Sequence, residues 1–186
     1  MKKIQVTIKG LAPILQARHP SPKEEAIILK RSVQAKKKTK DLTDKEAYEM
    51  RAYKTKDGLY YQPSEMVEAA MVKAAVNYRL EGKKTYKDLI KSGIIISPAE
   101  LIHKEQKKWK VDARWGVNKN TRGAIWVVRP RIDTWEIDFT MEILQDERID
   151  TDIAKEILSY AGLYVGVGAW RPKFGRFEIT KWKEGK

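Results

Sequence analysis

The chain has 186 residues, a net charge of +13 and no cysteine. Its length suits one domain with a hydrophobic core, and the lack of cysteine excludes disulfides, thiol nucleophiles and cysteine-based zinc sites. The two histidines, His19 and His103, show no ligand-like spacing, so we expect neither a metal ion nor a cofactor. Because the sequence contains no apolar run of signal-peptide or membrane-spanning length, we expect a cytoplasmic protein that contacts no membrane.

The charge is divided into blocks along the chain. Lys and Arg outnumber Asp and Glu by 15 to 6 in residues 1–56, by 9 to 2 in residues 104–131 and by 6 to 2 in residues 164–186. Residues 132–163 have the opposite balance, with 2 basic and 9 acidic residues. Basic segments that also carry aromatic residues are typical of surfaces that bind nucleic acid. The alternative is a basic surface that is merely solvated.

The first predicted element is a strand at residues 3–9, where apolar and polar residues alternate. A basic insertion follows at residues 18–56, and its second half could form a helix capped by Thr43 or Asp44. A helix over residues 64–80, with Ser64 as its N-cap, comes after a short strand. The other predicted elements are strands at 59–61, 94–96, 134–144 and 176–182, a basic hairpin at 104–131 and a helix at 152–163 capped by Asp150 or Thr151. Without the insertions, this order predicts an α+β fold with a ferredoxin-like or RRM-like β-α-β-β-α-β core.

A Gly-rich loop at residues 162–176 lies between the last helix and the last strand. Its glycines would let the backbone approach a polyanion, and Arg171, Lys173 and Arg176 would bind phosphates. Trp170 would stack on a base or brace the loop. The loop lacks the Gly-Lys-Ser/Thr of a Walker A motif and precedes a strand, so it is not a nucleotide-binding loop of that kind. The alternative interpretation is a tight connection whose glycines serve only to turn the chain.

The hairpin at residues 104–131 interleaves basic and aromatic side chains, which suits a single nucleic-acid strand. The candidate contact residues are Arg114, Trp115, Lys119, Arg122, Trp126, Arg129 and Arg131. The alternative is a solvated edge hairpin whose charges prevent sheet-to-sheet pairing. Lys36, Lys37 and Lys38 of the insertion would belong to a basic arm that orders on nucleic acid, or to a solvated loop.

His19 lies among basic residues, and a histidine there could act as general acid or base in metal-independent RNA cleavage. His103 follows an apolar pair and is expected to be structural. The acidic row Glu136, Asp138 and Glu142 admits three interpretations: a metal-nuclease site, a solvated face, or a surface that meets the basic hairpin of a neighbouring copy.

Three segments together resemble the RAMP superfamily, whose members form the backbone of CRISPR effector complexes. They are residues 8–15 (IKGLAPIL), residues 57–75 (DGLYYQPSEMVEAAMVKAA) and residues 165–179 (VGVGAWRPKFGRFEI). The combination also resembles a group of small proteins carried by bacteriophages and prophages. The resemblance implies a ferredoxin-like core, a protruding thumb-like hairpin before the third core strand, and assembly along single-stranded nucleic acid. Residues 63–68 (PSEMVE) depart from the family's Gly-Ser-Ser-Leu-Lys-Gly pattern.

The sequence therefore predicts a single RAMP-like domain that binds single-stranded RNA or DNA without cleaving it. Binding would tolerate many sequences and would be accompanied by assembly into a homo-oligomer or filament along the ligand. Two other functions remain open: a metal-independent endoribonuclease that uses His19 and the Gly-rich loop, and a viral protein-interaction module or inhibitor.

Overall fold

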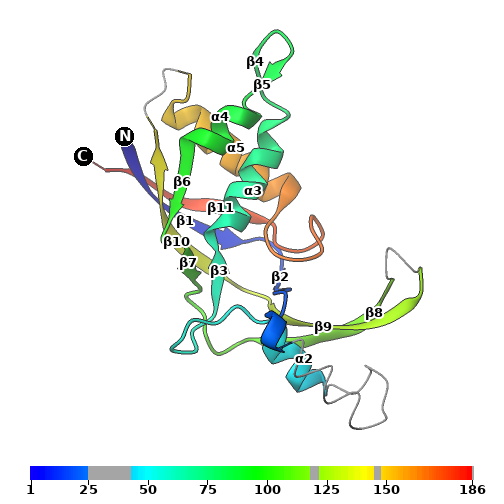
Figure 1. Ribbon diagram of the computed structural model, residues 1–186. Coiled ribbons are helices and arrows are strands. Elements are labelled where there is room, and N and C mark those ends of the chain that lie inside the picture. The colour runs from blue at the N-terminus through cyan, green and yellow to red at the C-terminus, as the bar shows by residue number, and fades with distance from the viewer. Residues whose placement is uncertain (25–42, 118–121, 145–147, 186) are drawn as a thin grey trace.

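The computed structural model describes residues 1–24, 43–117, 122–144 and 148–185, and its centre is a four-stranded antiparallel sheet (Figure 1). The strands of this sheet are β1 (Lys2–Gly10), β6 (Ile94–Ser97), β10 (Glu136–Ile143) and β11 (Phe177–Glu184). The helices on one face of it are α3 (Ser64–Ala75), α4 (Lys87–Gly93) and α5 (Thr151–Tyr160). The spatial order β11-β1-β10-β6, with chain order β1-α3-β6-β10-α5-β11, is that of a ferredoxin-like fold. The predicted core is confirmed.

The hydrophobic core lies between this sheet and the helices. In β1 the alternating residues Ile4, Val6 and Ile8 are buried, while their neighbours Lys3 and Gln5 are exposed. Each fully buried aliphatic side chain stabilises the fold by about 1.5–3 kcal/mol. Helix α3 contributes small residues to the same core, which lets the helix approach the sheet closely.

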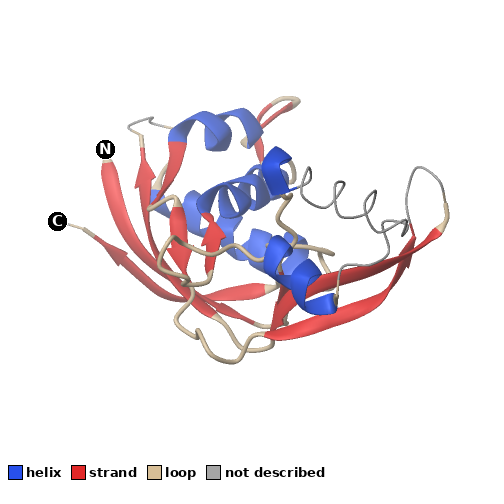
Figure 2. Ribbon diagram, turned by 60° about the horizontal axis from the view of Figure 1, so that its bottom comes forward, coloured by secondary structure: helices blue, strands red, loops and turns tan. Residues whose placement is uncertain are grey.

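The remaining strands form three small sheets. They are β2 (Ile14–Leu15), β8 (Lys110–Val117) and β9 (Ala124–Ile132) in the order β2-β9-β8, β3 (Tyr61–Pro63) with β7 (Glu100–Ile102), and β4 (Arg79–Glu81) with β5 (Lys84–Thr85). The β8–β9 hairpin extends away from the core as the expected thumb-like hairpin, with α2 (Asp44–Arg51) beside it (Figure 2). Helix α5 continues into a short π-helix, η1 (Ala161–Val165). Within the described ranges, no helix is long and apolar enough to cross a membrane.

Two predicted helix caps are confirmed. The hydroxyl of Thr43 accepts a hydrogen bond from the Glu46 backbone N–H at 3.3 Å, and the Glu46 carboxylate accepts one in return from the Thr43 N–H. The Asp150 carboxylate accepts a hydrogen bond from the Ile153 N–H at 2.8 Å at the start of α5. These local signals therefore set both helix starts.

The predictions around α3 were wrong in three details. The short strand before α3 covers Tyr61–Pro63, two residues later than expected, because it pairs with β7. Pairing holds the chain extended up to Pro63, so Pro63 occupies the N-cap position and Ser64 is the first helical residue. The Ser64 N–H donates to the Ala99 carbonyl at 2.9 Å instead. The helix also ends at Ala75 and not near residue 80, because the chain turns there into the β4–β5 pair.

Candidate nucleic-acid interface

The β8–β9 hairpin has two chemically different faces. Residues directly opposite each other in an antiparallel ladder share a face, and successive residues point to opposite faces. One face carries Asp112 opposite Arg129, flanked by Lys110, Arg114 and Arg131; we call these five residues the arginine face. The other face carries the opposed pair Trp115 and Trp126, which we call the tryptophan pair. The basic and aromatic residues that alternate in the sequence are therefore separated in space.

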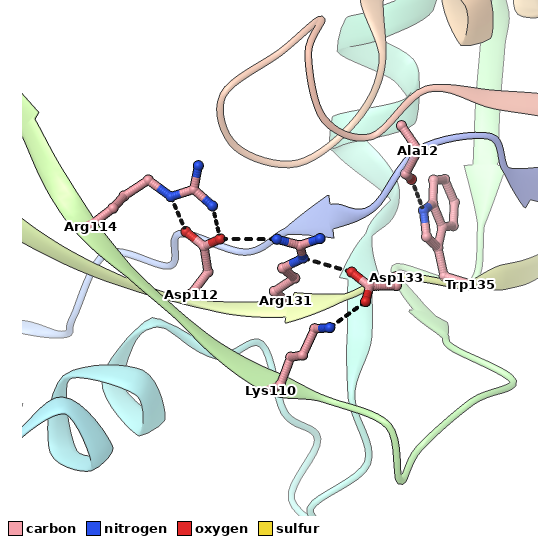
Figure 3. A network of polar contacts seen from close by, with 7 residues as sticks. All are labelled: Ala12, Lys110, Asp112, Arg114, Arg131, Asp133 and Trp135. Atoms are coloured by element: carbon pink, nitrogen blue, oxygen red, sulfur yellow. Dashed lines mark hydrogen bonds and ion pairs between the residues drawn. The ribbon is translucent and has the colours of Figure 1, made fainter.

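A buried carboxylate organises the arginine face (Figure 3). Asp112 is 5% exposed and accepts hydrogen bonds from both Nε and Nη2 of Arg114, with Nε at 2.7 Å. Arg131 extends the network, with its Nη1 3.5 Å from Asp112 and its Nε 2.6 Å from Asp133, which also binds Lys110. Bidentate pairing to a carboxylate fixes the plane of a guanidinium group. The carboxylates therefore hold Arg114 and Arg131 in defined orientations.

Exchanging Asp112 for asparagine should lower the free energy of unfolding by about 2 kcal/mol. Loss of a buried pair costs about 3–5 kcal/mol, and the value is smaller here because Arg114 and Arg131 are partly exposed. Asp133→Asn is the matched control, since its more exposed carboxylate should contribute less than about 1 kcal/mol. Urea unfolding compares them, and equal losses in the two variants would contradict an organising role for Asp112.

The Gly-rich loop packs against the segment that precedes the insertion. The Ala169 N–H donates to the Leu15 carbonyl at 2.8 Å. A Cβ atom would lie 2.6 Å from that carbonyl oxygen at Gly168, and 1.7 Å from the Val167 carbonyl oxygen at Gly175. Both glycines also have positive φ, +80° and +76°. These glycines therefore allow the chain to approach its own backbone, as the alternative interpretation of the loop expects.

Replacing Gly175 with alanine should destabilise the protein by about 2–4 kcal/mol, because strain from positive φ adds to a clash with the backbone. Gly58→Ala provides the control, since Gly58 also has positive φ (+83°) but no atom lies within 4 Å of its Cβ position. That control should lose about 1 kcal/mol. Urea unfolding separates the two contributions, and similar losses at both positions would refute the clash.

The loop and the arginine face meet through aromatic rings. The guanidinium carbon of Arg114 lies 5.1 Å from the Trp170 ring centroid and 5.5 Å from that of Phe174. Arg129 lies 5.5 Å from Trp170, and Arg131 lies 5.9 Å from Phe174. Such distances give cation–π attraction. Phe174 is buried, whereas Trp170 is 45% exposed, so part of its ring remains available to a ligand.

Arg129 is the least satisfied cation of the arginine face. Its Nε is buried and has no hydrogen-bond partner among the residues that the structure describes. Burial lowers the pKa of Arg129, and the nearby charges of Arg51 and Arg114 lower it further, while Asp112 opposes them. An arginine keeps its charge under such conditions. The site therefore holds more positive charge than its carboxylate balances.

Three predicted basic residues of the loop are exposed at its outer edge. Arg171 and Lys173 make no ion pair with any described residue, and the Nε of Arg176 donates to the Pro172 carbonyl at 3.0 Å. They are close in sequence to Trp170, whose ring contacts Arg114 and Arg129. We call Arg114, Arg129, Arg131 and Trp170, together with these loop cations, the composite surface.

The tryptophan pair lies on the opposite face of the hairpin, beside α2. Trp115 is 63% and Trp126 is 50% exposed, and their ring centroids are 5.4 Å apart. The Trp126 indole N–H donates to the Asp44 carboxylate at the start of α2, at 2.9 Å. These rings therefore cannot stack on the same nucleotide that contacts the arginine face.

Other predicted site residues stand apart from this surface. His19 is exposed and makes no hydrogen bond or ion pair within the described ranges, so no group there orients its ring for catalysis. Arg122 is exposed and has φ of +54°. Lys36, Lys37, Lys38 and Lys119 lie outside the described residues. Within the described part of the chain, no group of three His, Asp or Glu side chains could hold a metal ion.

The open face of the four-stranded sheet carries charged side chains that pair with one another. Lys104 binds Glu136 and lies 3.1 Å from Asp138, while Lys3 lies 2.9 Å from Glu142. The Thr7 hydroxyl donates to Asp138 at 2.6 Å, and these contacts lower the pKa of Asp138 against the opposing effect of burial. The outward positions of the four described strands carry no aromatic residue, unlike an RNA-recognition motif. The acidic row is thus paired within its own chain.

Comparisons with known proteins agree with this architecture. No family model matches the chain, and no curated protein matches it. A solved structure, "Cryo-EM structure of the Type III-B Cmr-beta bound to cognate target RNA", contains a similar chain, with a TM-score of 0.58 and 12% sequence identity. The match covers 100% of this chain and 61% of that chain, so the present chain spans less than two thirds of its neighbour. The similarity supports the predicted α+β fold.

Proposed function

We propose that this protein binds single-stranded RNA, with little regard to sequence and without cleaving it, on the composite surface of the arginine face and the Gly-rich loop. The observation that carries the proposal is Arg129, a half-buried cation with an unpartnered Nε beside the exposed ring of Trp170. A phosphate group beside the accessible part of this guanidinium would supply the negative charge that the arginine face lacks.

The residues of the composite surface would make different kinds of contact with RNA. Arg114, Arg129 and Arg131 are held in place by the hairpin and would bind phosphates at fixed positions. Arg171 and Lys173 are exposed and would add attraction that depends on salt concentration. Trp170 would stack on a base, which typically contributes about 1–3 kcal/mol for any base. A site of this kind would bind single-stranded RNA of many different sequences.

RNA is chosen over DNA because the similar solved chain belongs to a structure described as bound to target RNA. The direct test is fluorescence anisotropy with single-stranded RNA, single-stranded DNA and duplex of equal length across salt concentrations. We expect RNA to bind best and log affinity to fall linearly with log salt. Equal binding of all three ligands would contradict the proposal.

Removing Arg171 and Lys173 together, as a double alanine variant, should weaken RNA binding about tenfold and make the salt slope shallower by about two. The matched control is Lys83→Ala with Lys84→Ala, which removes the same charge at the remote β4–β5 pair. If the control weakens binding equally, the effect comes from net charge, and the loop is not part of the site.

The two remaining parts of the proposal are the absence of cleavage and assembly along the ligand. Labelled RNA should stay intact in EDTA, and cleavage that His19→Ala abolishes would instead make the protein an endoribonuclease.

Assembly along the ligand is supported by the RAMP-like fold. Glu136, Asp138 and Glu142 of the acidic row pair with basic residues of the same chain, so a contact between copies through this row would have to replace those pairs. Sedimentation with long and short RNA tests it, and a single protein per long strand would refute it.

A further inference from the structure

A groove with a volume of about 540 Å³ lies between α3 and α4, within the helix layer. Its floor consists of the aliphatic residues Ala69, Val72 and Val76 of α3, together with Ile90 and Ile94. Val76 is 50% exposed. Figure 1 shows that the β8–β9 hairpin extends from the opposite end of the molecule, so this groove is separate from the proposed RNA surface.

The charges that α3 contributes to the groove differ at its two ends. Glu65 and Glu68 lie at the start of α3, whereas Lys73 lies near its end. Lys87 belongs to the basic end as well, because the Tyr86 N–H bonds to the carbonyl of Tyr78, just after α3, at 3.0 Å. The third lysine of the groove, on α4, is Lys91.

The lysines of this groove have no ion-pair partner among the described residues, in contrast to Lys3, Lys104 and Lys110 of the sheet and hairpin. Their charge is therefore available to a partner. The described lining contains no aromatic ring on which a nucleobase could stack. An aliphatic floor between charged ends suits aliphatic side chains in the middle of a ligand and opposite charges at its ends.

We propose that this groove binds an amphipathic helix of a partner protein, with a stripe of aliphatic residues, acidic residues at one end and basic residues at the other. The proposal does not depend on RNA binding. Glu65 and Lys73 are eight residues apart on α3, which corresponds to about 12 Å along the helix axis. A partner helix of about three turns therefore reaches both ends with aliphatic residues at i, i+3, i+4 and i+7.

The probe is a synthetic helical peptide of that design, compared with a peptide of the same composition whose glutamates and lysines are mixed at both ends. We expect the first peptide to bind at least about tenfold more tightly in fluorescence anisotropy. Lys73→Glu with Lys87→Glu should remove this preference, and Val76→Asp should abolish binding of both peptides. The control Lys83→Glu with Lys84→Glu, outside the groove, should bind the first peptide like the parent protein.

Three results would overturn the proposal. Equal binding of the two peptides would show that the charged ends of the groove do not distinguish separated charges from mixed ones. Concentration-dependent dimerisation that Val76→Asp abolishes would assign the groove to a second copy of this chain. A larger loss of RNA affinity in the Lys73 and Lys87 double variant than in the Lys83 and Lys84 control would make the groove part of a nucleic-acid surface.

Discussion

Replacing Arg129 with methionine should give a protein that is more stable and binds RNA less well. The methionine removes a half-buried charge whose Nε has no partner among the described residues, and it relieves repulsion from Arg51 and Arg114. We expect the free energy of unfolding to rise by up to about 1 kcal/mol. We also expect RNA affinity to fall about tenfold and the salt slope to become shallower by about one. Urea unfolding and fluorescence anisotropy measure the two effects.

Arg131→Met is the matched control for this prediction. Arg131 is on the same face and strand, but it pairs with Asp112 and Asp133, so its loss should lower stability. Opposite signs of the stability change would identify Arg129 as a residue retained for binding and Arg131 as one that also supports the fold. If Arg129→Met lowers stability or leaves RNA affinity unchanged, Arg129 is not a phosphate site.

The second large effect concerns pH and His103. This histidine is 1% exposed, and its ring packs edge-on against Trp109 and Trp135 with centroid distances of 5.0 and 6.2 Å. Neither ring nitrogen has a hydrogen-bond partner among the described residues. Burial lowers the pKa of His103 to about 3, so the folded protein holds a neutral imidazole. The prediction from sequence that His103 is structural agrees with this position.

The unfolded chain binds a proton at this imidazole near pH 6.5, whereas the folded protein does so only near pH 3. Its contribution to stability is therefore complete above about pH 6.5 and falls by about 1.4 kcal/mol per pH unit below it. We expect a loss of about 2 kcal/mol between pH 6.5 and 5, where carboxylates still keep their charge. Urea unfolding of the parent, His103→Leu and the exposed-site control His19→Ala tests this. Parallel pH profiles for the parent and His103→Leu would contradict it.

The core of the fold is predictable because its signals are local. The period of two in β1 and β10 marks which side chains face the helices, and Thr43 and Asp150 are side-chain caps that work within three residues. The small pairings are not predictable in the same way. The two residues of β2 carry no pattern, and their pairing with Ile132 and Arg131 depends on chain far away in sequence.

The composition of the candidate site was only partly predictable. Arg114, Arg129, Arg131 and Trp170 were expected as contact residues, but Asp112 and Phe174, which hold them in place, were not. The separation of the arginines and tryptophans onto two faces could have been predicted from the sequence. Arg114 and Trp115 are neighbours on a strand, so their side chains must point to opposite faces. The α3–α4 groove could not be predicted from the charge blocks of the sequence. Residues 57–103 contain 6 basic and 6 acidic residues, so the segment has no net charge, and the charges are separated only in the folded chain.

The short strand β2 also has a mechanical consequence. Leu15 pairs with Arg131 of the hairpin, and its carbonyl accepts the Ala169 N–H of the Gly-rich loop at 2.8 Å. Leu15 is thus linked to both parts of the proposed RNA surface, by strand pairing to the hairpin and by a hydrogen bond to the loop. A force that tilts the hairpin would therefore also act on the loop, and we expect the two to move together rather than apart.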